Sequence, residues 1–361
     1  MILAALLAAV VAFPSPSGAG AGQPYLAARA DGTLLMSWIE SGALRFASMK
    51  NGRWSAPRVV VKRDELMVSG ADFPSIAEDA RGVLYAQWLE KHGHGYDVWV
   101  SASSDGGATW RKPVLVNRDA KEAEHGFASF APMSQGGMAM VWLDGREGTQ
   151  TQLRYAELDA SATVKNERVL DGRVCDCCST AMTMTAKGAL VAYRDRLDGE
   201  IRDISYVRRD GAKWSAPRRV HEDDWKIAGC PVNGPQVDAR GSRAAMAWFT
   251  AANAKDPRVY VAFSTDAGST FGKAIRVDAG HALGRVDTLL LKDGSALVTW
   301  IEADRILARR VRANGSVEAP QELARVTSAR AAGVPRIALV GNTAYVAWTD
   351  PATKTIKLIA Y

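Results

Sequence analysis

Three of the four cysteines in this chain lie within four consecutive positions, where they could act together. The stretch VCDCCST contains Cys175, Cys177 and Cys178 with Asp176 among them, and Cys230 follows further along. An even number of cysteines fits two disulfides, for which Cys175 with Cys178, or Cys230 with Cys177 or Cys178, are the natural pairs. A bond between the adjacent Cys177 and Cys178 would strain the backbone. Such disulfides would brace the loops that carry them.

The same cysteines also suit a metal site or a redox centre. Thiolates combined with imidazoles form a soft ligand set that favours copper or zinc. The candidate metal ligands are Cys175, Cys177, Cys178, Cys230, His92 and His94, with His125 and His281 further around. As a C-x-x-C element, the stretch could instead exchange disulfides with a partner, provided that a positive charge such as Arg173 stabilised the thiolate. The sequence leaves these three interpretations open.

A repeat of about fifty residues must position these groups. Its aromatic anchors are Trp38, Trp88, Trp142, Tyr193, Trp248, Trp300 and Trp348. Each anchor lies in an apolar, β-rich phrase that follows a turn signal, and a second alternating strand comes next. Four short antiparallel strands at this period are typical of a β-propeller blade. We therefore predict an all-β propeller of four-stranded antiparallel blades, with seven repeats, or six blades if the first and last units merge. The anchors are expected to pack between neighbouring blades.

The repeat predicts that the candidate ligands share one face of the propeller. Links between blades, and turns between second and third strands, emerge on the same side of such a ring. All four cysteines and all five histidines fall in segments of these two kinds, and we expect none of them in a strand core. Loops on a rigid scaffold commonly carry binding groups. This loop face is therefore the predicted functional surface.

Two turns carry a motif that identifies a family resemblance. The segments SSDGGATW (103–110) and STDAGSTF (264–271) match S-x-D-x-G-x-T-[WF] at the same place in their repeats. The motif resembles the Asp box of the sialidase-like (BNR-repeat) propellers, and the resemblance covers the chain from residue 22 onward. Asp105 and Asp266 are expected to accept hydrogen bonds from backbone N–H groups of their own turns. The family resemblance implies that these turns lie opposite the active-site face.

The resemblance to catalytically competent sialidases is poor. Gly22 stands where the family's first carboxylate-binding arginine would be, and without it carboxylate recognition loses its main charge-assisted contact. No Tyr–Glu nucleophile pair can be assigned. If the chain is nevertheless an exo-acting glycoside hydrolase, a carboxyl group with a raised pKa is needed beside the scissile bond. The candidate catalytic residues are Asp97, Asp144, Arg146, Arg194 and Asp195, with Asp72 as a further carboxyl group to consider.

Composition and the N-terminus bound the remaining possibilities. The chain of 361 residues has a net charge of +6 without a clustered basic stripe, so we predict no nucleic-acid partner. Residues 2–13 form an apolar run too short to span a bilayer, and Ala19-Gly20-Ala21 fits a cleavage site. We predict a signal peptide over 1–21, one propeller domain over 22–361, no membrane span, a periplasmic or secreted location and a monomer.

These observations favour a periplasmic or secreted propeller that binds a ligand or a soft metal ion, copper or zinc, through the Cys/His face. The first alternative is a sialidase-type exo-glycosidase. The second is a protein-interaction platform with disulfide-braced loops. The expected partner on the loop face is a small molecule, a glycan or a protein.

Overall fold

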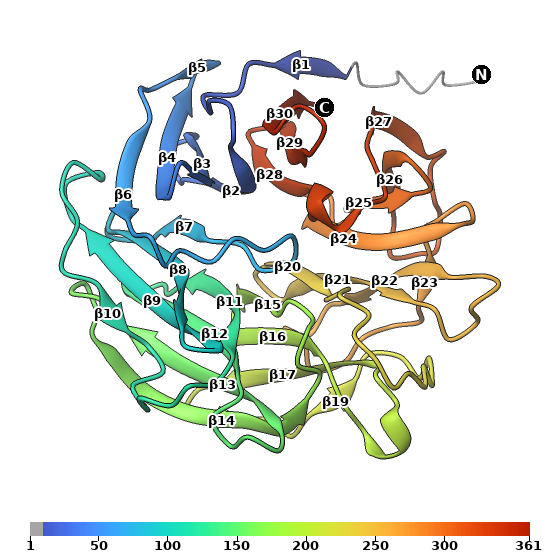
Figure 1. The fold of residues 1–361 in the computed structure, drawn as a ribbon. Coiled ribbons are helices and arrows are strands. Elements are labelled where there is room, and N and C mark those ends of the chain that lie inside the picture. The colour runs from blue at the N-terminus through green and yellow to red at the C-terminus, as the bar shows by residue number, and fades with distance from the viewer. Residues whose placement is uncertain (1–9) are drawn as a thin grey trace.

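The computed structural model describes residues 10–361, and seven antiparallel sheets are arranged around a central axis (Figure 1). The predicted β-propeller is therefore confirmed, with seven blades rather than six. Residues 1–9 of the predicted signal peptide lie outside the described residues. No helix in the described part of the chain is long and apolar enough to cross a membrane.

The first three blades follow each other along the chain. Blade one contains β2 (Gly22–Ala28), β3 (Leu34–Glu40), β4 (Ala43–Lys50), β5 (Arg53–Trp54) and β6 (Arg58–Lys62). Blade two contains β7 (Ser75–Glu78), β8 (Leu84–His92), β9 (Gly95–Ser103) and β10 (Val114–Leu115). Blade three contains β11 (His125–Pro132), β12 (Met138–Asp144), β13 (Thr151–Leu158) and β14 (Val164–Val174).

The next three blades repeat this order. Blade four contains β15 (Ala181–Thr185), β16 (Gly188–Arg194), β17 (Ile204–Asp210), β18 (Lys213–Trp214) and β19 (Arg218–Arg219), with the 3-10 helix η1 (Asp198–Glu200) after β16. Blade five contains β20 (Gln236–Arg240), β21 (Arg243–Thr250), β22 (Arg258–Ser264) and β23 (Ile275–Arg276). Blade six contains β24 (Ala282–Leu290), β25 (Ala296–Glu302), β26 (Arg305–Val311) and β27 (Gln321–Arg325), followed by η2 (Arg330–Ala332).

Blade seven closes the ring with both ends of the chain. It contains β28 (Arg336–Val340), β29 (Thr343–Asp350), β30 (Thr355–Ala360) and β1 (Val11–Phe13). The strand β1 pairs antiparallel with β30, so that Phe13 lies opposite Leu358, and Figure 1 shows β1 beside the C-terminal strand. The outer strand of the last blade is therefore β1, from the opposite end of the sequence. In this structure the strand comes from the segment predicted to be a signal peptide.

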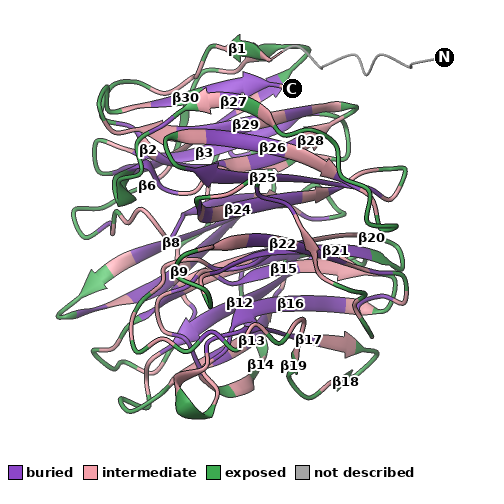
Figure 2. Ribbon diagram, turned by 90° about the vertical axis from the view of Figure 1, so that its right-hand side faces the viewer, coloured by how far each residue is buried: buried purple, intermediate pink, exposed green. Residues whose placement is uncertain are grey.

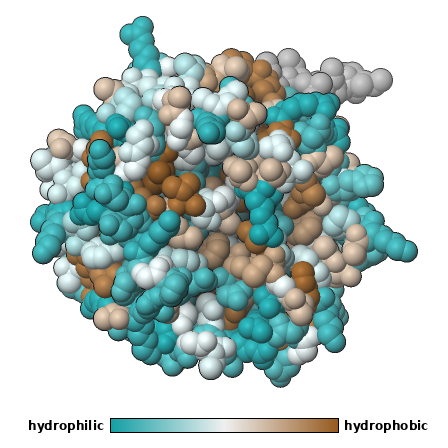
Figure 3. All heavy atoms as spheres, viewed as in Figure 1, coloured by the Kyte–Doolittle hydropathy of each residue, from teal (hydrophilic) through white to brown (hydrophobic). Residues whose placement is uncertain are grey.

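Large aromatic side chains fill the spaces between blades, as the repeat predicts. Trp142 on β12 is fully buried and packs in one cluster with Tyr85 and Val100 of the preceding blade. Buried residues run through the middle of the sheets, while exposed residues gather in the loops (Figure 2). Viewed along the axis, hydrophobic side chains are more frequent near the centre and hydrophilic ones at the rim (Figure 3).

Four of the tryptophan anchors of the repeat share a further contact. The indole N–H of each donates to a carboxylate two residues later at the end of the second strand, which satisfies both buried groups. The pairs are Trp38–Glu40, Trp88–Glu90, Trp142–Asp144 and Trp300–Glu302, at 2.7 to 3.0 Å. The W-x-acid pattern thus marks a carboxylate bound to the indole in four of its five occurrences. In the fifth, Trp348-Thr349-Asp350, the carboxylate accepts from Thr353 at 2.9 Å instead.

The two Asp-containing turns have the hydrogen bonds expected of them. Asp105 accepts from the backbone N–H of Thr109 at 3.0 Å and from its hydroxyl at 2.6 Å. Asp266 accepts from the corresponding groups of Thr270 at 3.0 and 2.7 Å. Both turns connect a third strand to a fourth, whereas the cysteines lie in links between blades. The predicted local role of these aspartates is confirmed.

Candidate functional site

Two links between blades bring all four cysteines together. The Sγ atom of Cys175 lies 3.7 Å from that of Cys177 and 3.8 Å from that of Cys178, in the link between β14 and β15. Cys230, in the link between β19 and β20, joins them, since ligand atoms of Cys177, Cys230 and Asp176 lie within 4.8 Å of one another. None of the four forms a disulfide in the structure. We call Cys175, Cys177, Cys178 and Cys230 the thiol cluster.

Backbone contacts explain why the two links approach so closely. The N–H of Asn233 donates to the Sγ atom of Cys178 at 3.4 Å, which ties the second link to the first. Gly234 lies directly against Ser179, and a Cβ atom at position 234 would meet the carbonyl oxygen of Ser179 at 2.0 Å. Only glycine fits this contact without displacement of one link. The GCPVNGP segment (229–235) therefore packs directly against the link that carries the other three cysteines.

An arginine supplies positive charge to the thiol cluster. Arg202 donates from Nη1 to the Sγ atom of Cys175 at 3.2 Å and lies 3.7 Å from a carboxylate oxygen of Asp176. The pKa of the Cys175 thiol is lowered by hydrogen bonds from Cys177 and Cys178, with Arg202 contributing. Burial raises the pKa of Cys178 in the same cluster. The contacts around Cys175 therefore stabilise its thiolate form.

The expected source of this charge, Arg173, is not the one observed. Its guanidinium binds Asp198 at 2.9 Å and lies 3.5 Å from Glu200. The sequence suggested Arg173 because it is two residues from Cys175. In the structure the Arg173 side chain contacts the η1 segment, and Arg202, which follows η1 in the chain, contacts Cys175 instead.

The histidines do not join the cysteines. Among residues 10–361, no group of three close ligand atoms combines a histidine with a cysteine. His92 pairs with Asp97 at 3.1 Å, and His94 is exposed near Glu122. His221 pairs with Asp223, and His281 is exposed just ahead of β24. The structure therefore separates these imidazoles from the thiol cluster.

His125 lies in a strand core, contrary to the expectation that no histidine would. It is the first residue of β11, is fully buried, and lies between Asp144 at 3.3 Å and Asp119 at 3.6 Å. Arg146 fills the remaining space of this group, with Nη2 at 2.6 Å from Asp144 and Nε at 3.2 Å from Asp119. The sequence placed His125 in the link before the strand, but β11 already begins at this residue, so its side chain is buried within the sheet. We call Asp119, His125 and Asp144 the carboxylate–imidazole cluster.

The candidate catalytic residues are buried, except for the partly buried Arg146, and have partners within the protein. Arg194 donates to the backbone carbonyls of Asn233 and Phe249 at 2.8 Å each, which links neighbouring blades. Burial raises the pKa of Asp195 to about 6, and its carboxylate accepts from a neighbouring hydroxyl. The full set Asp97, Asp144, Arg146, Arg194 and Asp195 lies outside the lining of the central pocket.

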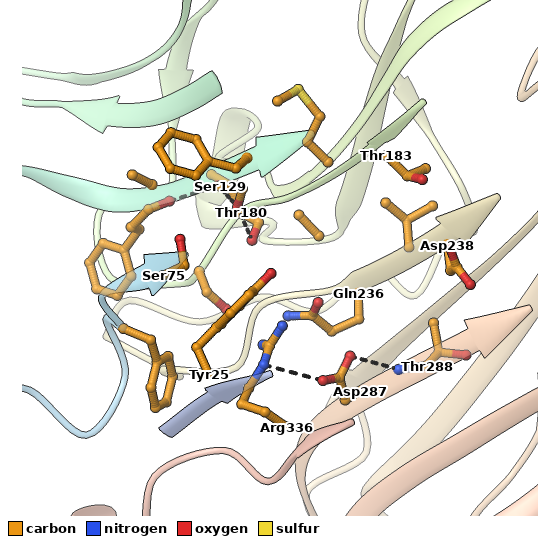
Figure 4. Close-up of a pocket in the computed structure, with 18 of the residues that line it drawn as sticks. Tyr25, Ser75, Ser129, Thr180, Thr183, Gln236, Asp238, Asp287, Thr288 and Arg336 are labelled. Atoms are coloured by element: carbon orange, nitrogen blue, oxygen red, sulfur yellow. Dashed lines mark hydrogen bonds and ion pairs between the residues drawn. The ribbon is translucent and has the colours of Figure 1, made fainter. Parts of the chain in front are cut away.

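The central pocket is lined instead by residues on and beside the innermost strands, and of the carboxyl groups considered from the sequence only Asp72 is among them (Figure 4). It has a volume of about 190 Å³. Arg336 stacks over the ring of Tyr25, with 4.8 Å from Cζ to the ring centroid, and lies 3.2 Å from Asp287. Asp72 also lines this pocket, and burial raises its pKa to about 7. Only the closure of the ring brings these first-strand positions together.

Comparisons with known proteins agree on the fold and go no further. No family model matches the chain, and no curated protein matches it either. Among solved structures, the polysaccharide lyase Uly1 gives a TM-score of 0.59 at 8% identity, over 99% of this chain and 93% of that one. A Dyadobacter fermentans protein of unknown function gives 0.56 at 12% identity, over 98% and 99%.

A third structure completes this group. The α-L-arabinanase of Penicillium chrysogenum, complexed with arabinobiose, gives a TM-score of 0.53 at 11% identity, over 98% of this chain and 96% of that one. All three structures agree with the β-propeller fold that the repeat predicts. Identities this low show a shared fold, and fold alone does not assign an activity.

Proposed function

We propose that this protein binds a soft metal ion, copper(I) or zinc, through the thiol cluster. The observation that carries the proposal is the spacing of three sulfur atoms at 3.7 and 3.8 Å around Cys175. In a tetrahedral zinc site with Zn–S bonds of about 2.3 Å, neighbouring sulfurs lie about 3.8 Å apart. The thiols thus have nearly the separation that a shared ion requires, on links that are fixed by the blades.

The surroundings of the cluster support the same function. Cys230 and Asp176 lie close enough to Cys177 to offer a fourth ligand. Several thiolates around one ion leave excess negative charge, which Arg202 beside Cys175 partly offsets. Binding would release the thiol protons, so affinity is expected to fall as pH is lowered.

The proposal is tested by metal binding under anaerobic conditions. We expect purified wild-type protein to take up one equivalent of copper(I) or zinc in competition with a chromophoric chelator. The variant Cys175→Ser should lose this affinity, and His92→Ala should retain it because His92 pairs with Asp97 instead. A thiol count and elemental analysis on natively isolated protein complete the test. Failure to bind either ion, with all four thiols oxidised, would refute the proposal.

We also propose that the protein acts outside the cytoplasm, on the basis of the apolar segment 2–13 and the Ala19-Gly20-Ala21 site. N-terminal sequencing of secreted protein is expected to give Gly22. Cleavage before Gly22 would remove β1 and leave β30 as an open edge of blade seven. A mature chain that begins before β1, and so keeps this strand, would contradict the expected cleavage site.

A second candidate function is carbohydrate processing in the central pocket. One observation favours it: Asp72, a buried carboxyl group with a pKa of about 7, lines a polar cavity on the propeller axis. A carboxyl group in this range can serve as a general acid. Uly1 is a polysaccharide lyase and the Penicillium protein an arabinanase, and both share this fold. Release of 4-methylumbelliferone from a sialoside, or of sugars from arabinan, that Asp72→Asn abolishes would support this function. No turnover on either would reject these substrates.

A further inference from the structure

A second cavity, with a volume of about 310 Å³, opens beside the thiol cluster. Its wall includes Cys177, Phe127, Val232, Leu283, Arg285 and Arg330. Among its lining residues, Cys177 is the one that carries sulfur, and apolar side chains from three separate links form much of the remainder. The cavity therefore gives a small molecule direct access to a thiol of the cluster.

Two arginines, the partly buried Arg285 and the exposed Arg330, give this cavity a positive charge, and no carboxylate is among its lining residues. Arg285 donates to the backbone carbonyls of Ser328 and Ala329, each at 2.9 Å, which fixes its guanidinium in the wall. Within the described part of the chain, neither Arg285 nor Arg330 forms an ion pair with an acidic side chain, and no carboxylate lines the cavity. Burial, followed by the charge of Arg330, lowers the pKa of Arg285. An anion placed between the two guanidinium groups would relieve this repulsion.

The nearest acidic residue of the cluster does not serve as the counter-ion. Asp176 lies 3.7 Å from Arg202 and close to Cys230, and it is not part of the cavity wall. The cavity thus combines two unpaired cations, an apolar wall and one thiol. A molecule that satisfies all three carries a carboxylate, a short aliphatic body and a sulfur.

We propose that this cavity binds an anionic low-molecular-weight thiol that carries copper(I) to and from the thiol cluster, an inference that rests on the proposed metal-binding function. The carboxylate of the carrier binds Arg285 and Arg330, and its metal-bearing sulfur lies at Cys177. Transfer is a ligand exchange. The Cys177 sulfur forms a bond to copper(I), the bond from copper to the carrier sulfur breaks, and the Cys177 proton passes to the departing thiolate. Copper remains in the +1 state throughout.

The depth of the cysteines gives this transfer a direction. Cys177 is partly exposed and lines the cavity, while Cys175 and Cys178 are buried behind it. An ion accepted by Cys177 is already within bonding range of the sulfur of Cys175, 3.7 Å away. Each step exchanges one sulfur ligand for another, so the ion need never be released to water.

The kinetic test compares two forms of delivered copper(I). Stopped-flow transfer from the copper(I)–glutathione complex is expected to slow about tenfold in Arg330→Gln, because a charge-assisted contact with the carrier is lost. Transfer from copper(I)–acetonitrile, which carries no carboxylate, should be unchanged. Arg312→Gln is the matched control, since Arg312 is an exposed arginine paired with Glu318 in a turn between third and fourth strands. Equal rates in wild type and Arg330→Gln with the glutathione complex would overturn the proposal.

A metal-free measurement separates this inference from the proposed function. S-methylglutathione, which keeps the carboxylates but has no thiol, should bind wild type and Arg312→Gln by calorimetry, and bind Arg330→Gln about tenfold more weakly. If wild type takes up copper(I) but shows no affinity for S-methylglutathione, the carrier cavity is refuted and metal binding stands. If S-methylglutathione binds in an Arg330-dependent manner and no metal is taken up, copper transfer is refuted.

Discussion

Two clusters of potential metal ligands lie at neighbouring positions of the ring, and they are neutralised in different ways. The carboxylate–imidazole cluster opens blade three, and the thiol cluster lies in the link to blade four. In the first, Arg146 reaches Asp144 and Asp119 at 2.6 and 3.2 Å and supplies the cation from within the chain. In the second, Arg202 reaches one sulfur, that of Cys175. The cation thus neutralises the carboxylates of the first cluster, whereas the cation beside the second cluster contacts one of its four sulfurs and leaves that cluster suited to an external ion.

Ligand chemistry explains why each cluster has its own kind of partner. The planar guanidinium matches the geometry of carboxylates and forms bidentate bonds with them. Thiolates are soft ligands, and a soft metal ion binds them more strongly than a hydrogen-bond donor does. Burial opposes ionisation of Asp144, but the nearby imidazole of His125 and the hydrogen bonds from Arg146 outweigh it and lower the pKa of Asp144. The carboxylate–imidazole cluster is thus stable as an ion pair.

The largest expected effect concerns a buried carboxyl group that has no cation at all. The pKa of Asp72 is raised by burial from 3.8 to about 7. The protonated Asp72 therefore favours the folded state most below about pH 4. As the pH rises to about 7, this contribution to the free energy of unfolding is lost, a change of about 4 kcal/mol. We expect Asp72→Asn, measured by urea unfolding between pH 4 and 8, to remove this dependence. The exposed Asp64→Asn should keep the wild-type profile, and identical profiles for all three proteins would contradict the assignment.

The next effect removes the internal cation of the carboxylate–imidazole cluster. Arg146→Met leaves the fully buried Asp144 without its main partner, and we expect the free energy of unfolding to fall by about 3 kcal/mol. Arg208→Met breaks a pair with the exposed Asp210 and should cost less than about 1 kcal/mol. If both variants lost the same stability, the internal cation would have no special role.

In the thiol cluster the expected effect is on metal affinity rather than on folding. Cys175 has two sulfurs within 3.8 Å, so Cys175→Ser should weaken copper(I) binding at least about 100-fold. The midpoint of urea unfolding of the metal-free protein should change little. The variant His125→Asn, made in the carboxylate–imidazole cluster, should leave copper affinity unchanged. Loss of copper binding in that variant would show that the clusters are not independent.

The smallest effect is expected at the exposed cysteine. Cys230 contributes its sulfur from the neighbouring link, and water or another ligand can take its place. We expect Cys230→Ser to weaken copper(I) binding by about tenfold or less. If Cys230→Ser weakened copper(I) binding as much as Cys175→Ser does, Cys230 would be an essential ligand and the metal site would lie closer to the exposed cysteine.

Much of the fold could be predicted because its signals are local. The aromatic anchor and turn of each repeat identify a blade from adjacent residues, and Asp105 and Asp266 bind within their own turns. The grouping of cysteines on one face followed from the repeat alone. The W-x-acid pattern was available in the same way and would have marked Asp144 as structural. Arg202 and Arg336 could not be found, because their partners lie on other strands or in other blades.

The sequence by itself determined that this chain forms a propeller and that its cysteines lie on the loop face, because repeat length, turn residues and strand order are properties of contiguous segments. Tertiary structure decided that β1 completes blade seven, that Arg202 rather than Arg173 lies beside Cys175, and that His125 is buried beside an arginine. Closure of the ring joins β1 to β30, and packing between links and strands brings the other partners together. The distances and burial that set charge and ligand geometry arise from these tertiary contacts.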